Sequence, residues 1–252
     1  MLSKSSYDYI QIGLSLRILR HISSDTTYEF ASTEMKDLKI LLRDANFEVS
    51  LSALESTKVS DLEEVLSSEE EPKKKKVGEE LRSKISKAYD YIEFVVFSES
   101  ETKKIYEIPK RRFNSDYLLN SPNKLFAGDV FSKLDDIAQN DIKSACRCLL
   151  FGEATATAFH ILRATESTLK SYYFMYRTEK RLRTPMWGNM LDQLNAMESN
   201  KPPEHLLTTL DIIRRVYRNP TQHPQATYET DSAQDLFGVC LDVIGKMGSE
   251  LT

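Results

Sequence analysis

The sequence predicts an all-α fold, and three observations support this prediction. Glycine and proline are scarce, with eight of each in 252 residues, which argues against a turn-rich β-sheet protein. Apolar residues recur every three or four positions along most of the chain, as on one face of an amphipathic helix. No run approaches the roughly 20 consecutive apolar residues that span a bilayer. We therefore expect a soluble helical protein with one large domain or two modest ones, and no membrane association.

Residues 1–108 are expected to form an N-terminal helical region. Three stretches show helical spacing of apolar residues: Ile10, Leu14 and Ile18; Leu38, Leu41 and Leu42; Leu81, Ile85, Tyr89, Ile92 and Val96. Before the third stretch, residues 67–80 (SSEEEPKKKKVGEE) have no apolar face and contain proline and glycine. Such a composition is typical of an exposed loop or a disordered connection.

A change of character marks the expected boundary between two structural regions. The segment from residue 101 to residue 128 is polar and irregular, with turn-forming residues at Pro109, Pro122 and Gly128. Within it, residues 105–108 (IYEI) have the composition of a short strand. We place the boundary after residue 108 and expect the second domain to cover the rest of the chain.

Residues 109–252 are expected to form an up-and-down helical bundle, because short connections join the helices. The expected helices cover residues 131–150 and 154–176, and then begin at Trp187, after Pro203 and at about Thr230. Pro220 is expected to end or kink the fourth of these helices, since proline has no backbone N–H. Thr230 is expected to be the N-cap of the last helix, with Asp231 in its first turn.

Several kinds of chemistry have no motif in this chain. There is no Gly-rich phosphate loop, no HExxH and no GxSxG elbow, so we expect no cofactor and no metal centre. Three cysteines fit a reducing compartment, and we expect a cytoplasmic protein. The net charge of −4 excludes a strongly basic nucleic-acid-binding chain, but residues 163–183 carry six basic and two acidic side chains. This local excess could hold phosphates or simply be a solvated helix face.

The hexapeptide at residues 218–223 (RNPTQH) is the strongest indication of a functional site. Arg218 stays charged and can bind two phosphate oxygens with its fork of N–H groups. His223, with a reference pKa of about 6.5, can exchange a proton near neutral pH. Asn219 could orient the imidazole or a phosphate. Alternatively, Arg218 and His223 only stabilise the end of the preceding helix, where cations interact favourably with the helix dipole.

Two longer stretches place this motif in a family context: FAGDVFSKLDDIAQNDIKSACRCLLFGEATATAFHILRATESTLKSYY, and RVYRNPTQHPQATYETDSAQDLFGVCLDVIGKM. Together with Trp187-Gly188 between them, they resemble the HEPN domain superfamily of bacterial and archaeal toxin and defence systems. The resemblance covers residues 125–250, half of the chain. The family signature is an Arg, usually followed by Asn, with a His after a short spacer, which Arg218, Asn219 and His223 match.

The resemblance implies a metal-independent RNA endonuclease of a toxin–antitoxin or anti-phage defence system. It implies Arg218, Asn219 and His223 as the catalytic residues, RNA as the substrate, a homodimer in which two motifs line one cleft, and an antitoxin or defence protein as a further partner. In one toxin branch, a Tyr two residues after the His is nucleotidylated by the antitoxin. Here that position is Gln225 and the nearest tyrosine is Tyr228, which puts this form of regulation in doubt.

The helix upstream of the motif carries two more candidates, Arg163 and Glu166, which are three residues apart and face together. They are expected either to contact RNA or orient the motif, or to form an ion pair within the helix. His160, one turn earlier, is interpreted as a hydrogen-bonded histidine of the bundle. The alternative function is a catalytically inactive HEPN-like module that binds nucleic acid or protein. A second alternative is a purely structural helical adaptor.

Overall fold

The chain forms two compact units, Met1–Tyr106 and Glu107–Thr252. The computed structural model describes residues 6–179, 181–223 and 226–251. Each unit has its own hydrophobic core, and the two are described separately. The division falls two residues before the boundary expected from the sequence. Throughout the described residues the regular secondary structure is helical, which confirms the all-α prediction.

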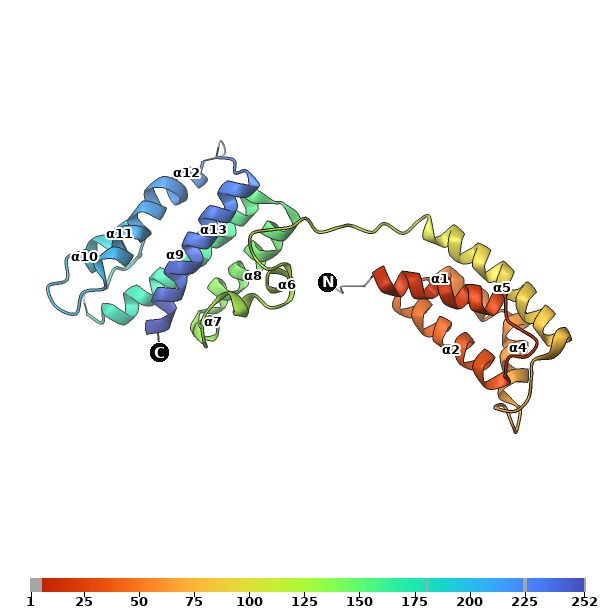
Figure 1. Cartoon of the computed structure of the whole chain (residues 1–252). Coiled ribbons are helices and arrows are strands. Elements are labelled where there is room, and N and C mark those ends of the chain that lie inside the picture. The colour runs from red at the N-terminus through yellow and green to blue at the C-terminus, as the bar shows by residue number, and fades with distance from the viewer. Residues whose placement is uncertain (1–5, 180, 224–225, 252) are drawn as a thin grey trace. The chain divides into compact units, whose positions relative to one another are not determined.

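The N-terminal unit is a group of helices around one core (Figure 1). Its helices are α1 (Ser6–Arg20), α2 (Tyr28–Asp44), α3 (Glu48–Leu54), α4 (Thr57–Ser67) and α5 (Gly78–Ser100). α1 packs against α2 and α5, while α3 and α4 each contact both α2 and α5. α2 begins at a capped end, because the hydroxyl oxygen of Thr27 accepts a hydrogen bond from the backbone N–H of Phe30 at 3.3 Å.

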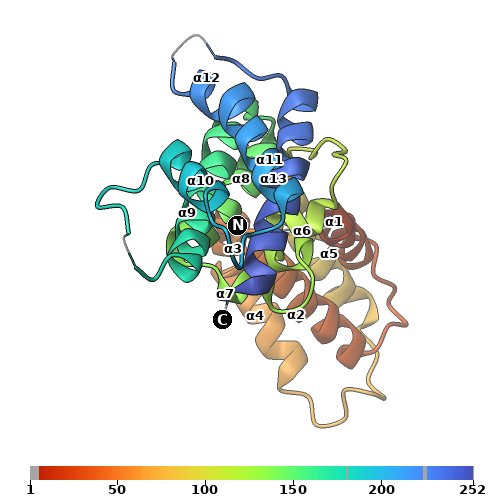
Figure 2. The same ribbon diagram turned by 90° about the vertical axis from the view of Figure 1, so that its left-hand side faces the viewer.

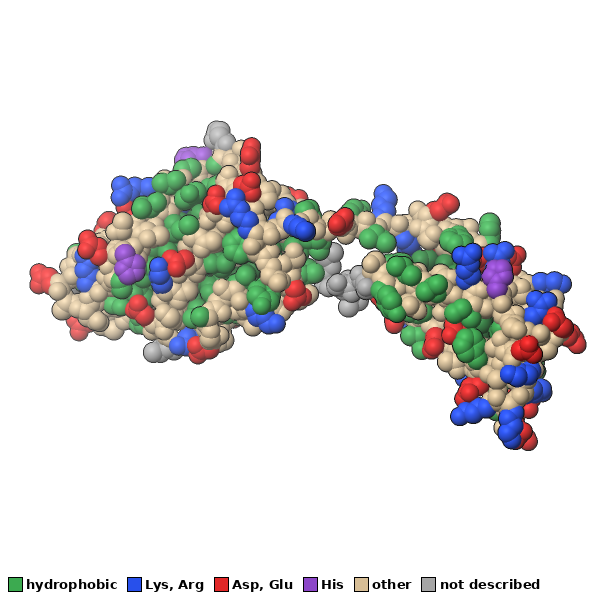
Figure 3. Space-filling view, viewed as in Figure 1, with side chains coloured by type: hydrophobic (Ala, Val, Ile, Leu, Met, Phe, Trp, Pro, Cys, Tyr) green, Lys and Arg blue, Asp and Glu red, His purple; other side chains and the backbone are tan. Residues whose placement is uncertain are grey.

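Helix α1 is apolar on two opposite faces. Ile12 and Leu16 are buried in the core, whereas Ile10 is 59% exposed, Leu14 48% and Ile18 40%. Hydrophobic side chains gather on the face of the unit that carries α1 (Figure 3). The spacing of Ile10, Leu14 and Ile18 correctly indicated a helix, but these residues lie on the side of α1 that faces away from the core.

The connection between α4 and α5 is more ordered than its composition suggested. Residues 68–77 separate the two helices, so both ends of the expected loop 67–80 belong to helices. The backbone N–H of Tyr28 donates to the carbonyl of Lys75 at 3.0 Å, and that of Val77 donates to the carbonyl of Thr26 at 2.9 Å. Val77 is buried, while the lysines before it stay exposed. These backbone contacts fix the segment against the start of α2.

The short strand expected at residues 105–108 does not form. Within this segment Ile105 is 70% exposed and Tyr106 80% exposed, and the backbone has no regular structure. A strand requires a neighbouring strand for its hydrogen bonds, and no described segment offers one here. The expectation of a strand was therefore wrong.

The C-terminal unit is built on the helical pair α8 (Asp136–Phe151) and α9 (Ala154–Tyr176), with α13 (Thr230–Glu250) packed on α9 (Figure 1). Gly152, with φ of 86°, ends α8 in the left-handed conformation and lets the chain turn directly into α9. α8 begins five residues later than expected because Asp135 caps it, accepting a hydrogen bond from the N–H of Ala138 at 2.8 Å. The residues before the cap form a separate short helix, α7 (Val130–Lys133).

The remaining elements surround this pair. They are α6 (Ser115–Asn120), the short 3-10 helix η1 (Pro122–Leu125), α10 (Trp187–Asn195) and α11 (Glu204–Ile213). α11 packs against α10 and α13 (Figure 2). Buried side chains from these helices form one continuous core, and Trp187, the single tryptophan of the chain, lies in it with 1% of its surface exposed.

Helix α11 does not end at Pro220 but changes type before it. It continues as a π-helix, η2 (Arg214–Arg218), and then as α12 (Asn219–Thr221). Pro220 lies in the first turn of α12, where a missing N–H is tolerated, so the expected break at proline is replaced by the π-helix before it. Thr230 is the first residue of α13 rather than its cap; Glu229 precedes it without a side-chain cap.

Candidate active site

Arg218 is the last residue of the π-helix and is held by an ion pair with α9. Its Nε and Nη2 atoms donate hydrogen bonds to the Glu166 carboxylate, at distances of 3.2 to 3.4 Å. Both side chains are partly buried, with 26% of Arg218 and 31% of Glu166 exposed. π-Helical turns are rare and occur often at functional sites, because they change the direction of side chains along a helix. The pairing fixes the guanidinium over α9 although 52 residues separate the two residues in sequence.

The two other motif residues, Asn219 and His223, have exposed side chains. The backbone of His223 is held by two hydrogen bonds: its N–H donates to the carbonyl of Pro220 at 2.9 Å, and its carbonyl accepts from Ala226 at 3.1 Å. Within the described part of the chain, the imidazole of His223 makes no ion pair or hydrogen bond. A fixed backbone with a free ring leaves this imidazole accessible to a ligand.

A pair of hydroxyl groups, one of them buried, anchors the segment that carries the motif. The Oγ1 atom of Thr221 donates to the carbonyl of Tyr217 at 2.6 Å and lies 2.6 Å from the hydroxyl of Tyr228. The backbone N–H of Tyr228 donates to Thr155 at the start of α9, at 3.1 Å. Burial raises the pKa of Tyr228. Tyr228 therefore has a structural role here, and Gln225, the position compared with the modified Tyr of the toxin branch, lies outside the described residues.

Arg163 and Glu166 lie on one helix as expected, but each pairs with a different neighbour. Glu166 binds Arg218, whereas Nε of Arg163 lies 3.3 Å from Oδ2 of Asp141 on α8. The structure thus brings Glu166 and Arg218 together, whereas Arg163 pairs separately with Asp141 of α8. Arg163 is 63% exposed and can reach a ligand without leaving its place.

Sequence reasoning missed Asp141 altogether and did not count His160 among the site residues. Nδ1 of His160 lies 2.8 Å from Oδ1 of Asp141, and the Asp141 side chain is only 7% exposed. A signal for Asp141 was available: it lies at helical spacing from Ala138 and Ala145, which line the core side of α8. An acidic residue in a core stripe requires a partner, and His160 and Arg163 are those partners.

The described side chains of α9 and of the motif supply charged and titratable groups. No group of three or more His, Cys, Asp or Glu residues that could hold a metal ion exists among the described residues. None of the described helices is both long and apolar enough to cross a membrane. The charged and titratable groups include two arginines paired with carboxylates, the partly exposed imidazole of His160 and the exposed imidazole of His223. These are groups that bind phosphates and transfer protons.

Comparison with known proteins adds no assignment. No protein-family model, no curated protein and no solved structure matches this chain.

Proposed function

We propose that this chain is a metal-independent RNA endonuclease of a toxin–antitoxin or anti-phage defence system, with the reaction in the C-terminal unit. One observation supports this function more than any other. Arg218, which stays charged, is fixed by Glu166 on a π-helical turn, five residues before the exposed imidazole of His223. A fixed cation and, five residues later, an exposed imidazole are the kinds of group that can cleave a phosphodiester when no metal takes part.

The reaction begins with the 2′-hydroxyl of a ribose. His223 takes the proton of this hydroxyl, and the resulting oxygen attacks the neighbouring phosphorus. The bond to the 5′-oxygen then breaks, and that oxygen must receive a proton. The products are a 2′,3′-cyclic phosphate and a 5′-hydroxyl end. Arg218 stabilises the negative charge that develops on the phosphate oxygens, and Asn219 orients the phosphate or the imidazole.

Arg218 can serve both Glu166 and a phosphate. Its hydrogen bonds to Glu166 use Nε and Nη2, so among the described contacts Nη1 is left for a further acceptor. The carboxylate also keeps the long side chain in one orientation before RNA arrives, which reduces the conformational entropy lost on binding. A homodimer with two such motifs along one cleft, and a regulatory partner such as an antitoxin, complete the proposal.

The same ion pair also favours a second function, a catalytically inactive module that binds nucleic acid or protein. In the resting state, Glu166 neutralises Arg218, and a purely structural pair would look the same. The two functions differ in what the loss of Arg218 changes. In the enzyme, Arg218→Ala abolishes cleavage, whereas in a structural pair it changes only the free energy of unfolding, by about 1 kcal/mol or less.

The test is cleavage of a total RNA pool by the purified protein in EDTA. We expect the wild type to release fragments with cyclic phosphate ends. Arg218→Ala and His223→Ala are expected to lower the rate by about 100-fold or more. Arg215→Ala and His205→Ala are matched controls, because both residues are exposed and lie on the same or a neighbouring helix. Inactive wild type that still binds RNA would support the binding module instead.

A further inference from the structure

Helix α5 of the N-terminal unit carries an exposed aromatic stripe. Tyr91, Phe94 and Phe97 follow one another at intervals of three and are 60%, 69% and 61% exposed. Buried residues of the same helix, among them Ile92 and Val96, belong to the core of the unit. At about 100° per residue, Phe94 lies on the side of the helix opposite this buried face. Single exposed apolar residues are common, whereas neighbouring aromatic side chains on one face are typical of an interaction site.

One charge of each sign flanks the stripe at equal distance from its centre. Lys87 lies seven residues before Phe94 and Glu101 lies seven residues after it, so the three residues share one face of the helix. Glu101 follows the last residue of α5 in a helical conformation, so it continues the same face. Both charged side chains are exposed, and neither forms an ion pair with the residues that the structure describes. They lie about 21 Å apart along the axis, too far to pair with each other.

This order of groups is complementary to itself. In an antiparallel pair of α5 helices with the two-fold axis at Phe94, each residue faces the one that lies equally far on the other side of the axis. Tyr91 then faces the partner's Phe97. The two Phe94 rings meet at the axis, and Lys87 faces the partner's Glu101. A parallel pair would instead bring the two lysines together and the two glutamates together, and like charges so placed are unfavourable. The charges therefore select the antiparallel arrangement.

The apolar area of the stripe is large enough for a specific contact between two copies. An aromatic side chain can bury about 150–250 Å², so about 100–150 Å² of each ring in the stripe is still exposed. The six rings of two copies would cover about 600–900 Å², roughly half of the about 1,600 Å² of a typical specific interface. An aromatic centre with charged residues at its edges is also the usual arrangement of such interfaces.

We propose that the protein pairs with a second copy of itself through an antiparallel contact between the two α5 helices. Phe94 lies at the centre of this contact, and the ion pairs between Lys87 and the partner's Glu101 set its direction and register. The contact belongs to the N-terminal unit and its test uses no RNA, so it stands or falls separately from the proposed nuclease.

The first experiment is sedimentation equilibrium of the full chain over a series of concentrations. We expect the wild type to be a dimer that dissociates on dilution. Phe94→Asp should raise the Kd of the dimer by about 100-fold or more, because it places two carboxylates at the centre of an apolar contact. Ile10→Asp is the matched control, since this residue is 59% exposed on the other apolar face of the unit, on α1, and should leave the Kd unchanged.

The second experiment exchanges the charges at low ionic strength. Lys87→Glu and Glu101→Lys each bring like charges together twice in a dimer and should raise the Kd by about tenfold or more. The double variant Lys87→Glu/Glu101→Lys restores opposite charges and should return the Kd close to that of the wild type. A mixture of the two single variants should form mixed dimers, because one copy supplies only glutamates and the other only lysines at these positions.

The possible results decide the inference clearly. A wild type that stays monomeric at every concentration, or a dimer that survives Phe94→Asp, would overturn it. Loss of the dimer with Ile10→Asp and not with Phe94→Asp would place the contact on α1 instead. A double charge variant as weak as the single variants would show that the antiparallel register is wrong. Circular dichroism verifies that each variant is folded, and the charge variants test the contact even where Phe94→Asp does not fold.

Discussion

Each unit of this protein buries one carboxylate among its described residues, and the two carboxylates differ in their hydrogen-bond partners. Glu99, at the end of α5, accepts hydrogen bonds from the N–H and the hydroxyl of Ser50, at 2.8 and 2.7 Å, and lies 3.5 Å from Nζ of Lys103. Asp141 faces a histidine and an exposed arginine, and its Oδ2 accepts no hydrogen bond from the residues that the structure describes. Glu99 therefore has the hydrogen-bond partners expected of a structural residue, whereas one oxygen of Asp141 accepts no hydrogen bond from the described residues.

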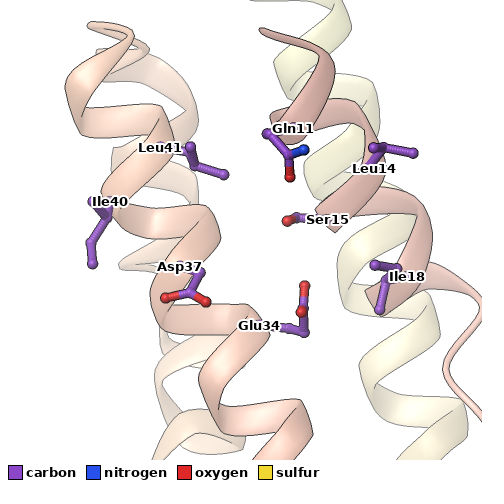
Figure 4. A pocket seen from close by; sticks show the side chains of 8 residues that line it. All are labelled: Gln11, Leu14, Ser15, Ile18, Glu34, Asp37, Ile40 and Leu41. Carbon is purple, nitrogen blue, oxygen red and sulfur yellow. The ribbon is translucent and has the colours of Figure 1, made fainter. Parts of the chain in front are cut away.

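The surfaces of the two units also differ in the side chains they carry. Along α9, His160, Arg163 and Glu166 form a polar series that connects α8 to the π-helix. In the N-terminal unit, by contrast, a groove of about 420 Å³ lies between α1 and α2 (Figure 4). Half of its lining residues are apolar and two are carboxylates: Gln11, Leu14, Ser15, Ile18, Glu34, Asp37, Ile40 and Leu41. The polar series on α9 pairs charged side chains with one another, whereas the groove of the N-terminal unit combines apolar side chains with the carboxylates of Glu34 and Asp37.

The largest expected effect is on the stability of the N-terminal unit. Glu99→Ala removes the acceptor of both Ser50 hydrogen bonds and leaves a buried N–H unsatisfied, so the free energy of unfolding should fall by about 2–3 kcal/mol. Urea unfolding followed by circular dichroism measures the loss. Glu101→Ala, at an exposed position two residues later, is the control and should stay within about 0.5 kcal/mol. Equal effects of the two substitutions would contradict the structural role of Glu99.

The same residue predicts a dependence of stability on pH. Burial alone would raise the pKa of Glu99, but the hydrogen bonds from Ser50 and the charge of Lys103 outweigh it, so the pKa lies below its ordinary value of 4.5. A lowered folded-state pKa contributes stability above the unfolded pKa, and this contribution is lost as the pH falls below about 4.5. Glu99→Gln should therefore be less stable than the wild type at pH 7, with the difference shrinking on acidification. A difference that is constant from pH 7 to pH 3 would contradict this prediction.

Helical periodicity predicted much of the fold because it reports which residues face a core. The bounds of α9 agree with those expected, since Ala158, Leu162 and Leu169 form a regular buried stripe. In α1 the same signal could not identify the core side, because Ile10 and Ile12 are both apolar while only Ile12 is buried. Periodicity of apolar residues is informative only where the other face of the helix is polar.

The features that the sequence did not reveal depend on backbone geometry and on distant partners. Residues 68–77 are held by backbone hydrogen bonds to the start of α2. Side-chain composition does not predict such bonds. The π-helix before Pro220 has no characteristic composition. For the site, Arg218, Asn219, His223, Arg163 and Glu166 were named from the sequence. Spacing along the chain could not show that Glu166 pairs with Arg218, 52 residues away, or that Asp141 on another helix pairs with Arg163.

The smallest expected effect is on the stability of the C-terminal unit. Asp141→Asn removes a buried charge, and both partners of Asp141 already reach water, so neither is left buried and unpaired. We expect the free energy of unfolding to change by about 1 kcal/mol or less, because the desolvation cost of the carboxylate offsets its attraction to His160 and Arg163. The fluorescence of the buried Trp187, in the same unit, reports this transition during urea unfolding. A loss as large as that of Glu99→Ala would make Asp141 a structural residue too, and the contrast between the two carboxylates would no longer stand.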